Sequence, residues 1–187
     1  MSAKGQLFVV TGPSGVGKGT LIAELLKEVT GLELSVSATT RTPRPGEQEG
    51  VDYHFMDDAS FEQHVQAGDF IEHAGYAGHR YGTLASEVGP RIERGAGVVL
   101  EIELQGARQV RERMPEAVRI FITPPSAQAL RDRLVGRGTD EPEQIESRLE
   151  VAREELDAAH EFEHVIVNDD LDVAAAELAK LVRAEMG

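Results

Sequence analysis

A glycine-rich segment near the N-terminus has the residue types and spacing of a phosphate-binding loop. It reads Gly-x-x-x-x-Gly-Lys from Gly12 to Lys18. The glycines let backbone N–H groups point at a phosphate, and the lysine adds positive charge for the outer phosphates of a nucleoside triphosphate. The usual pattern continues with a Ser or Thr whose hydroxyl binds Mg²⁺, whereas here Gly19 and then Thr20 follow the lysine. We therefore expect a nucleotide phosphate site whose metal depends on other oxygen ligands.

A second set of side chains has the chemistry to bind another phosphate group. Arg41 and Arg44 lie in a segment rich in Thr and Pro, and Tyr53 and Tyr81 follow along the chain. Guanidinium groups and phenol hydroxyls both donate hydrogen bonds to a dianion. Taken alone, the two arginines fit an ordinary charged surface equally well, so the residue types leave both interpretations open.

Strands and helices that alternate along the chain must position these groups. Short apolar runs of strand length lie at 7–10, 97–102, 118–122 and 164–168. Apolar residues at helical spacing follow the glycine-rich loop and recur at 104–114, 126–136, 143–160 and 170–185. Because strands alternate with helices, we predict an α/β fold with a parallel sheet covered by helices on both faces.

Two segments interrupt this alternation. Residues 35–95 are rich in Thr, Arg, Pro, Gly, Tyr and His and contain short alternating stretches, which predict an inserted lobe of mixed, mostly antiparallel strands. Residues 130–150 carry arginines beside Gly136, Gly138 and Pro142, and form a second candidate mobile element.

The length, cysteine content and net charge of the chain exclude several classes of protein. A chain of 187 residues favours one domain, or one core with an inserted lobe. The absence of cysteine excludes a disulfide framework, a thiolate zinc site and a cysteine nucleophile. A net charge of −14 argues against a nucleic-acid partner. Because the sequence shows neither a signal peptide nor an apolar run of membrane-spanning length, we expect a cytoplasmic protein with no membrane partner.

Six motifs resemble those of the guanylate kinase family in order and spacing, and the resemblance covers nearly the whole chain. They are Gly-Pro-Ser-Gly-Val-Gly-Lys at 12–18, Ser-x-Thr-Thr-Arg-x-Pro-Arg-x-Gly-Glu at 37–47, Gly-x-Asp-Tyr at 50–53, Phe-Ile-Glu at 70–72, Tyr-Gly-Thr at 81–83 and Glu-x-Glu-x-Gln-Gly at 101–106. The second motif is the most specific, because a phosphate loop alone fits many families.

The resemblance implies both a fold and a reaction. The fold is a P-loop NTPase-type parallel sheet flanked by helices, with an inserted mixed α/β GMP-binding lobe at 35–95 and a helical lid at 127–150. The core is then discontinuous in sequence and consists of residues 1–34, 96–126 and 151–187. The reaction is that of a nucleoside-monophosphate kinase of purine metabolism, which transfers the γ-phosphoryl group of ATP to GMP, with Mg²⁺ as cofactor and dGMP as a slower acceptor. ATP and GMP are thus the implied partners, while the sequence leaves the oligomeric state undecided.

The resemblance also implies which residues bind ATP and take part in catalysis. The ATP-binding set is Gly12, Pro13, Ser14, Gly15, Val16, Gly17, Lys18, Gly19, Thr20, Arg137 and Asn168. The implied catalytic residues are Lys18, Arg41, Arg137 and Arg148, of which the last two would grip the ATP phosphates from the lid. Arg133 is a weaker candidate on the same segment.

The implied GMP site combines phosphate and base recognition. The resemblance assigns the GMP phosphate to Arg41, Arg44, Tyr53 and Tyr81, the guanine to Ser37, Glu72 and Thr83, and further contacts to Glu47, Glu101 and Glu103. Guanine presents an O6 acceptor beside N1–H and N2–H₂ donors, so a carboxylate accepts two hydrogen bonds while hydroxyls donate to O6. Adenine lacks the N1–H, and a site built around such bonds rejects it.

Two acids follow a predicted strand at its carboxyl end. Glu101 and Glu103 are alternate residues, so both side chains are expected on the same side of the strand, toward the nucleotide. In similar kinases acids at this place help to organise Mg²⁺ and its waters, and we expect Glu101 to act through water. The family usually has Asp where this chain has Glu103, and the extra methylene changes the reach of that carboxylate.

Two alternatives compete with the kinase hypothesis. One is a guanylate-kinase-like module that binds phosphorylated peptides through the arginine and tyrosine pocket without catalysis; such modules typically lose parts of the phosphate loop, whereas Lys18 is present here. The other is a kinase on the same scaffold with a different acceptor, such as a ribose phosphate. Ser37, Glu72 and Thr83 together favour a pocket that recognises a base.

Overall fold

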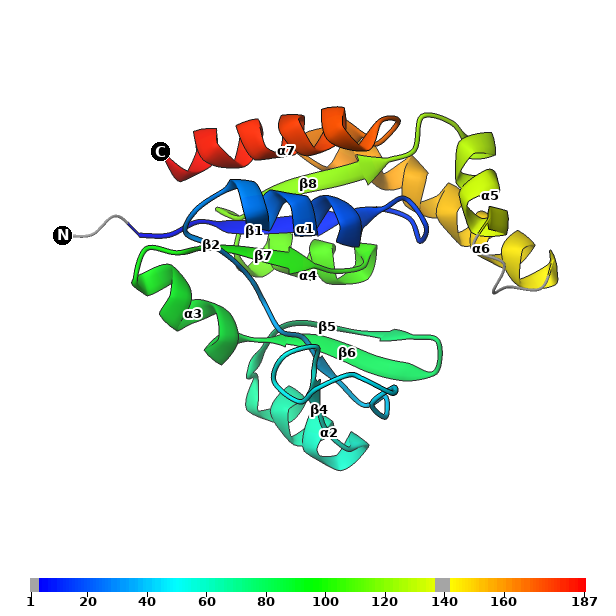
Figure 1. Ribbon diagram of the computed structural model, residues 1–187. Coiled ribbons are helices and arrows are strands. Elements are labelled where there is room, and N and C mark those ends of the chain that lie inside the picture. The colour runs from blue at the N-terminus through cyan, green and yellow to red at the C-terminus, as the bar shows by residue number, and fades with distance from the viewer. Residues whose placement is uncertain (1–3, 137–141) are drawn as a thin grey trace. The chain divides into compact units, whose positions relative to one another are not determined.

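The computed structural model describes residues 4–136 and 142–187 (Figure 1). The chain divides into two compact units. The first unit holds the residues up to Leu7, Gly31–Leu100 and Gln105–Ala117, and the second holds Phe8–Thr30, Glu101–Leu104 and Val118–Gly187. Each unit is therefore assembled from segments that are distant in the sequence.

Five strands form a parallel sheet in the order β2-β7-β1-β8-β9. They are β1 (Leu7–Thr11), β2 (Leu32–Leu34), β7 (Gly97–Glu101), β8 (Val118–Thr123) and β9 (His164–Val167). In the second unit β1 pairs in parallel with β8, and β8 pairs in parallel with β9. In the first unit β2 pairs in parallel with β7. Every residue of β1 is buried, which explains why this strand is a continuous apolar run.

Helices of the second unit follow the phosphate loop and complete the C-terminal part of the chain. They are α1 (Lys18–Glu28), α5 (Ala127–Gly136), α6 (Pro142–Asp157), the 3₁₀ turn η1 (Ala158–Glu161) and α7 (Leu171–Met186). The helices α1 and α7 pack against each other. Asp170 caps α7 by accepting a hydrogen bond from the backbone N–H of Val173 at 3.0 Å. At the other end of α7, Arg183 donates to the carbonyl of Glu28 at 2.9 Å, which ties the two helices together.

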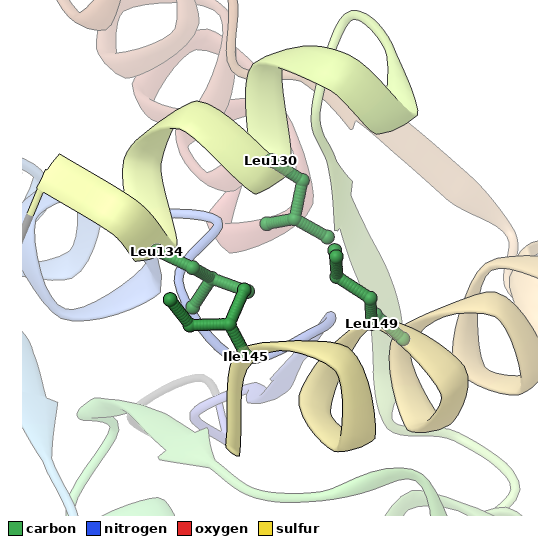
Figure 2. Close-up of a cluster of buried hydrophobic side chains, with 5 residues drawn as sticks. Leu130, Leu134, Ile145 and Leu149 are labelled. Carbon is green, nitrogen blue, oxygen red and sulfur yellow. The ribbon is translucent and has the colours of Figure 1, made fainter. Parts of the chain in front are cut away.

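Helices α5 and α6 are joined by an apolar cluster (Figure 2). Leu130 and Leu134 of α5 point toward Ile145 and Leu149 of α6, and Ala152 completes the cluster. Leu134 is 0% exposed. Because apolar burial of this kind is the main source of stability in small helical pairs, the two helices are held together as one packed body.

The first unit contains a second sheet with the strand order β4-β3-β6-β5. Its strands are β3 (Ala38–Thr39), β4 (His54–Phe55), β5 (Phe70–Tyr76) and β6 (His79–Leu84). The pairs β3/β6 and β5/β6 are antiparallel, and β3/β4 is parallel. The same unit holds α2 (Asp58–Ala67), α3 (Ala85–Glu93) and all but the first residue of α4 (Leu104–Arg113).

Aromatic packing forms the core of this second sheet. Phe61 of α2 and Phe70 of β5 stack with their ring centroids 4.5 Å apart, and both are buried together with Ala38. Gly82 of β6 makes room for this stack, because a Cβ atom there would lie 2.8 Å from the ring of Phe70. The glycine between Tyr81 and Thr83 is thus required by the close approach of a ring.

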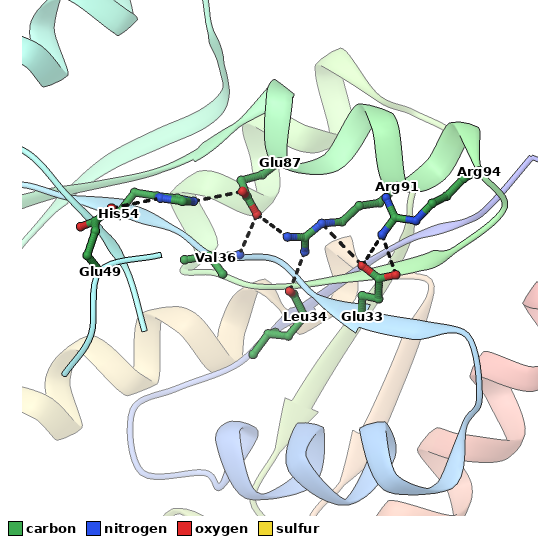
Figure 3. Close-up of polar contacts among 8 residues, drawn as sticks. All are labelled: Glu33, Leu34, Val36, Glu49, His54, Glu87, Arg91 and Arg94. Carbon is green, nitrogen blue, oxygen red and sulfur yellow. Dashed lines mark hydrogen bonds and ion pairs between the residues drawn. The ribbon is translucent and has the colours of Figure 1, made fainter. Parts of the chain in front are cut away.

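Ion pairs and hydrogen bonds connect α3 to β4 and to residues 33–36, the segment that leads into the second sheet (Figure 3). Glu87 pairs with His54 of β4 at 3.0 Å and with Arg91 at 2.8 Å, and it lies 3.5 Å from the backbone nitrogen of Val36. Arg91 in turn donates to the carbonyl of Leu34 at 2.9 Å. These contacts fix the backbone on either side of Ser35 against α3.

The predicted fold class is confirmed: a parallel sheet flanked by helices, with a mixed, mostly antiparallel sheet inserted between its strands. The apolar runs form strands within a residue or two of the predicted bounds. The strand β2 was not predicted, and within the inserted lobe, expected only as mixed α/β, no bounds were predicted for α2 and α3. None of the helices in the described parts of the chain combines the length and apolar character that crossing a bilayer requires.

We expect Leu134→Ala to lower the free energy of unfolding by about 2–5 kcal/mol, because it leaves a cavity in the cluster between α5 and α6. For a chain of this size that corresponds to about 2–4 °C in Tm per kcal/mol. The neighbouring Val135 is 53% exposed, so Val135→Ala is the matched control and should change stability by less than about 0.5 kcal/mol. Thermal and denaturant unfolding test this; equal losses in the two variants would show that the cluster contributes little.

Candidate functional site

The phosphate loop connects β1 to α1 and depends on three glycines with positive φ. Gly12, Gly15 and Gly17 have φ of 155°, 86° and 96°. Gly17 is the N-cap of α1 and provides no side-chain hydrogen bond to the first turn. The first N–H groups of the helix therefore remain available to an anion, and the positive end of the helix dipole lies at the same place.

Lys18 is the first residue of α1 and folds over the loop. Its Nζ donates to the carbonyl of Gly12 at 2.5 Å and lies 3.3 Å from the carbonyl of Pro13. The side chain is only 8% exposed. A buried ammonium requires such acceptors, and phosphate oxygens are acceptors of the same kind with more negative charge.

Two side chains from the C-terminal half hold the loop in place. Asn168, directly after β9, is buried and donates from its side-chain amide to the carbonyl of Val16 at 2.8 Å. Arg133 of α5 donates to the backbone carbonyl of Asn168 at 2.7 Å and to that of Val16 at 3.4 Å. Asn168 therefore lies against the loop, and Arg133 is engaged by backbone carbonyls.

Glu101 lies beside the start of α1. A Cβ atom on Gly19 would be 3.8 Å from both of its carboxylate oxygens. Desolvation raises the pKa of Glu101, the positive charge of Lys18 opposes this rise, and the negative charge of Glu103 adds to it. Carboxylate oxygens thus lie next to the residue whose side chain, in the usual phosphate loop, supplies the hydroxyl.

Glu155 of α6 is a site residue that the sequence analysis missed. It is 8% exposed, hydrogen-bonds to Glu103, and lies within reach of the positive charge of Lys18. Desolvation, followed by the charge of Glu103, raises the pKa of Glu155 to about 7. One feature of the sequence could have indicated it. Position 155 lies three residues after the buried Ala152, where the apolar stripe of the helix predicts an apolar residue, and an acid stands there instead.

The first unit brings together three of the residues expected to hold the GMP phosphate. The guanidinium of Arg41 lies 5.3 Å from the ring centroid of Tyr53, and the rings of Tyr53 and Tyr81 are 6.1 Å apart. Arg41 also pairs with Glu47 at 2.7 Å. The hydrogen bond with Glu47 is the largest cause that raises the pKa of Arg41, and a hydrogen bond with Tyr81 contributes in the same direction.

Glu47 also fixes the loop that carries both arginines. Its second oxygen accepts a hydrogen bond from the backbone N–H of Arg44 at 2.7 Å. Arg44 itself is exposed. Ser37 is partly buried, and its carbonyl accepts a hydrogen bond from the backbone N–H of His54 at 2.9 Å.

Glu72 and Thr83 form a buried polar pair across β5 and β6. They are register partners, and the Thr83 hydroxyl donates to the Glu72 carboxylate at 2.7 Å. Glu72 is 4% exposed and Thr83 is 0% exposed. Burial raises the pKa of Glu72, while the hydrogen bonds with Thr83 and the charge of Arg113 lower it. A carboxylate held in this way is suited to accept hydrogen bonds from a ligand.

The remaining predicted residues are distributed over the second unit. Ser14 is partly buried, Thr20 is exposed, and Arg148 lies partly buried on α6. Arg137 lies outside the described residues. The residues expected to bind ATP thus fall in the second unit, together with Glu101 and Glu103, and the other residues expected to bind GMP fall in the first.

Comparison with known proteins identifies the family. The chain matches the family described as Guanylate kinase over residues 4–185. The chain belongs to the guanylate kinase family. The recognition made from the six motifs is therefore confirmed.

Individual guanylate kinases are similar over almost the whole chain. That of Chromohalobacter salexigens is 51% identical over 183 residues, which cover 98% of this chain and 85% of the relative. That of Thermus thermophilus is 52% identical over 182 residues, covering 97% and 82%. The crystal structure of guanylate kinase from Anaplasma phagocytophilum superimposes with a TM-score of 0.80 at 34% identity, covering 99% of this chain and 88% of that chain.

The buried acid on α6 gives a pH-dependent prediction. Because folding raises the pKa of Glu155 above its ordinary value of 4.5, the unfolded chain binds fewer protons between about pH 4.5 and 7, and stability falls as the pH rises through that range. Glu155→Gln removes this loss. The full shift would correspond to about 3 kcal/mol. Because the protein relaxes around a buried charge, we expect on the order of 1 kcal/mol.

Tm values at pH 5 and pH 8 test this. We compare the Tm of Glu155→Gln with that of the unsubstituted protein at each pH. We expect the difference, variant minus unsubstituted protein, to be about 2–4 °C larger at pH 8 than at pH 5. Glu154→Gln, on the exposed face of the same helix, is the control and should show no such change. A difference that is independent of pH would mean that Glu155 is charged in the folded protein throughout this range.

Proposed function

We propose that this chain transfers the γ-phosphoryl group of ATP to GMP, giving ADP and GDP, and that it also accepts dGMP. The observation that carries the proposal is the buried Glu72–Thr83 pair, because a protein that bound only phosphate would have no use for a desolvated carboxylate at this place. The phosphate loop with Lys18 supports the donor half of the reaction. The relatives described above are guanylate kinases, which gives no support to a non-catalytic phosphopeptide-binding module.

For the donor, we assign the ATP phosphates to the loop from Gly12 to Thr20. The N–H groups at the start of α1 and the ammonium of Lys18 provide positive potential at the β- and γ-phosphates. In the transferring state the Lys18 ammonium exchanges the loop carbonyls for phosphate oxygens. Asn168 orders the loop through Val16 and borders the nucleotide.

For the acceptor, we assign the GMP phosphate to Arg41, Arg44, Tyr53 and Tyr81. Arg41 and the two tyrosines already lie together, and Glu47 orients the Arg41 guanidinium by a hydrogen bond at 2.7 Å. We assign the guanine to Ser37, Glu72 and Thr83. Glu72 accepts hydrogen bonds from N1–H and N2–H₂, which adenine cannot offer in the same arrangement.

The residues beside Lys18 fit a magnesium ion bound together with ATP. Mg²⁺ prefers oxygen ligands and is usually held by one or two carboxylates, water and substrate phosphates. Glu101 provides such a carboxylate next to Gly19, where the loop itself has no hydroxyl to offer. We propose that Glu101 holds the ion, directly or through water, and that Glu103 and Glu155 set the charge around it. When bound, the ion neutralises charge on the phosphates.

The lid is assigned to residues 127–150, the GMP lobe to 35–95 and the core to the remaining segments. Because the apolar cluster joins α5 to α6, a closing movement would carry both helices as one body. Arg148 on α6, together with Arg137, would then add positive charge at the transferring phosphoryl group. Since the ATP residues and most of the GMP residues fall in different units, transfer requires the two bound nucleotides to meet, and closure also excludes water.

The reaction needs positioning and charge neutralisation rather than a covalent intermediate on the protein. The GMP phosphate attacks the γ-phosphorus in line, and ADP leaves. Lys18, Arg41 and the lid arginines stabilise charge on the transferring group. Since both substrates are metabolites of the cytoplasm, we place the protein there, and the net charge of −14 disfavours nucleic acid as a partner.

A coupled ADP-release assay with ATP and Mg²⁺ tests the proposal, with GMP, dGMP, AMP, UMP or no acceptor. We expect turnover to require GMP or dGMP, and Lys18→Ala to lower kcat by at least about 100-fold, as the loss of one stabilising charge does. Lys27→Ala, an exposed lysine on the same helix, should keep full activity. GMP binding without turnover in the intact protein would favour the non-catalytic module.

A second test concerns the phosphate end of the GMP site. Arg41→Lys keeps the charge but loses the planar fork, so we expect KM for GMP to rise by about 30- to 100-fold, with little change in KM for ATP. Arg94→Lys, at an exposed ion pair with Glu33, is the matched control and should leave both constants unchanged. If KM for GMP is unaffected in Arg41→Lys, the phosphate is bound elsewhere.

A further inference from the structure

One face of α4 is directed at strand β5 through three residues. Gly106, Gln109 and Arg113 are spaced by three and four positions, which places them in one row along the helix. Each of them contacts the stretch from Phe70 to His73. Glu72, the proposed guanine-recognition residue, lies within that stretch.

Gly106 is a glycine because Glu72 approaches it closely. Its φ is not positive, so the backbone conformation does not demand glycine, and alanine would be the better helix former. A Cβ atom at Gly106 would lie 3.0 Å from the Glu72 carboxyl carbon and would collide with its Oε2. The carboxylate therefore occupies the space that any other side chain at position 106 would need.

Gln109 pairs with the backbone next to Glu72. Its side-chain amide donates to the carbonyl of His73 at 2.7 Å, and its side-chain oxygen accepts from the N–H of His73 at 3.2 Å. Strand β5 lies at the edge of its sheet, so these two groups have no strand partner on that side. The side chain of Gln109 thus replaces a neighbouring strand and fixes β5 in position.

Arg113 fixes β5 on the other side of Glu72. It donates to the carbonyl of Phe70 at 2.7 Å and to that of Ile71 at 3.0 Å. Its positive charge lowers the pKa of Glu72 against the effect of burial. Gly106 is the third residue of α4, so the positive end of the helix dipole also favours the charged form of the carboxylate.

We propose that Gly106, Gln109 and Arg113 are positioning residues for guanine specificity, which hold the Glu72 carboxylate at the place where it accepts both N1–H and N2–H₂. Gly106 provides the space, and Gln109 and Arg113 fix the strand on either side. The inference rests on the proposed role of Glu72. It predicts that substitutions on α4 change the choice of base without touching either nucleotide.

Inosine monophosphate reports this effect, because its base lacks the N2 amino group and keeps N1–H and O6. The difference between GMP and this analogue therefore measures the second hydrogen bond to Glu72. A misplacement of about 1 Å can cost on the order of 100-fold in rate. We expect Gly106→Ala to raise KM for GMP by about 100-fold, with KM for ATP unchanged, and to reduce the preference for GMP over the analogue by about 10-fold or more.

The matched control is Gly89→Ala. Gly89 is also a glycine within a helix, but nothing lies within 4 Å of a Cβ atom there, so this variant should keep the activity and the preference. In the double variant Gly106→Ala, Glu72→Asp the shorter acid leaves room for the methyl group. We expect its KM for GMP to be lower than the product of the two single effects predicts.

Gln109→Met tests the strand clamp independently, in case Gly106→Ala does not fold. It keeps the length of the side chain and removes both hydrogen bonds to His73. We expect KM for GMP to rise by about 10-fold and the preference for GMP to fall, with kcat at saturating GMP nearly unchanged. Glu112→Gln, on the exposed face of α4, is its control.

The outcomes separate this inference from the proposed function. If the intact protein shows no GMP-dependent turnover, or if Glu72→Gln keeps the full preference for GMP, the proposed function or the role of Glu72 is wrong and the inference is overturned with it. If Glu72→Gln loses the preference while Gly106→Ala and Gln109→Met keep it, only the positioning by α4 is wrong. Loss of the preference in all three variants, with both controls intact, supports the inference.

Discussion

Removing a charged side chain from water costs free energy unless the fold supplies partners around it, and both proposed nucleotide sites depend on such side chains. Lys18 is 8% exposed and Glu72 is 4% exposed. Each is partnered by groups that cannot move far: Lys18 by carbonyls of the loop, and Glu72 by Thr83, its register partner on β6. The fold offsets the free energy of burial through the glycines, cross-strand pairs and helix ends near these residues, which bring hydrogen-bonding groups to the buried charges.

The loop around Lys18 requires partners from distant parts of the chain. Glycine at positions 12, 15 and 17 permits the positive φ angles, but a glycine-rich segment is flexible unless other residues form contacts with it. Asn168 provides such a contact by donating to the carbonyl of Val16 in the loop. Arg133 in turn donates to the carbonyl of Asn168, directly after β9. The order of the phosphate site thus depends on β9 and α5, which lie more than 100 residues away in the sequence.

Local patterns predicted the long apolar strands, the amphipathic helices and the phosphate loop, because each of these is encoded by neighbouring residues. They did not predict β2, with only three residues, or α3, in which Gly89 and Pro90 disfavour a helix although Val88 and Ile92 are buried. The motifs indicated Arg41, Tyr53 and Tyr81, which the structure brings together. For Glu155 the only local sign was an acid where the apolar stripe of α6 predicts an apolar residue, and its partner Glu103 lies in another segment. The contact of Gly106 with Glu72 also joins distant segments, so no local spacing encodes it.

The two departures from the usual pattern are explained by what lies beside them. Gly19 lacks a hydroxyl, and the carboxylate of Glu101 lies next to it. Glu103 is longer than the family's usual Asp, and it hydrogen-bonds to the buried Glu155. Each change therefore occurs where a carboxylate from another segment provides oxygen atoms near Lys18. Carboxylate oxygens on this side of the loop come from the end of β7, from the residues after it and from α6. Oxygen atoms that a cation prefers thus lie beside the lysine although the loop has no hydroxyl at position 19.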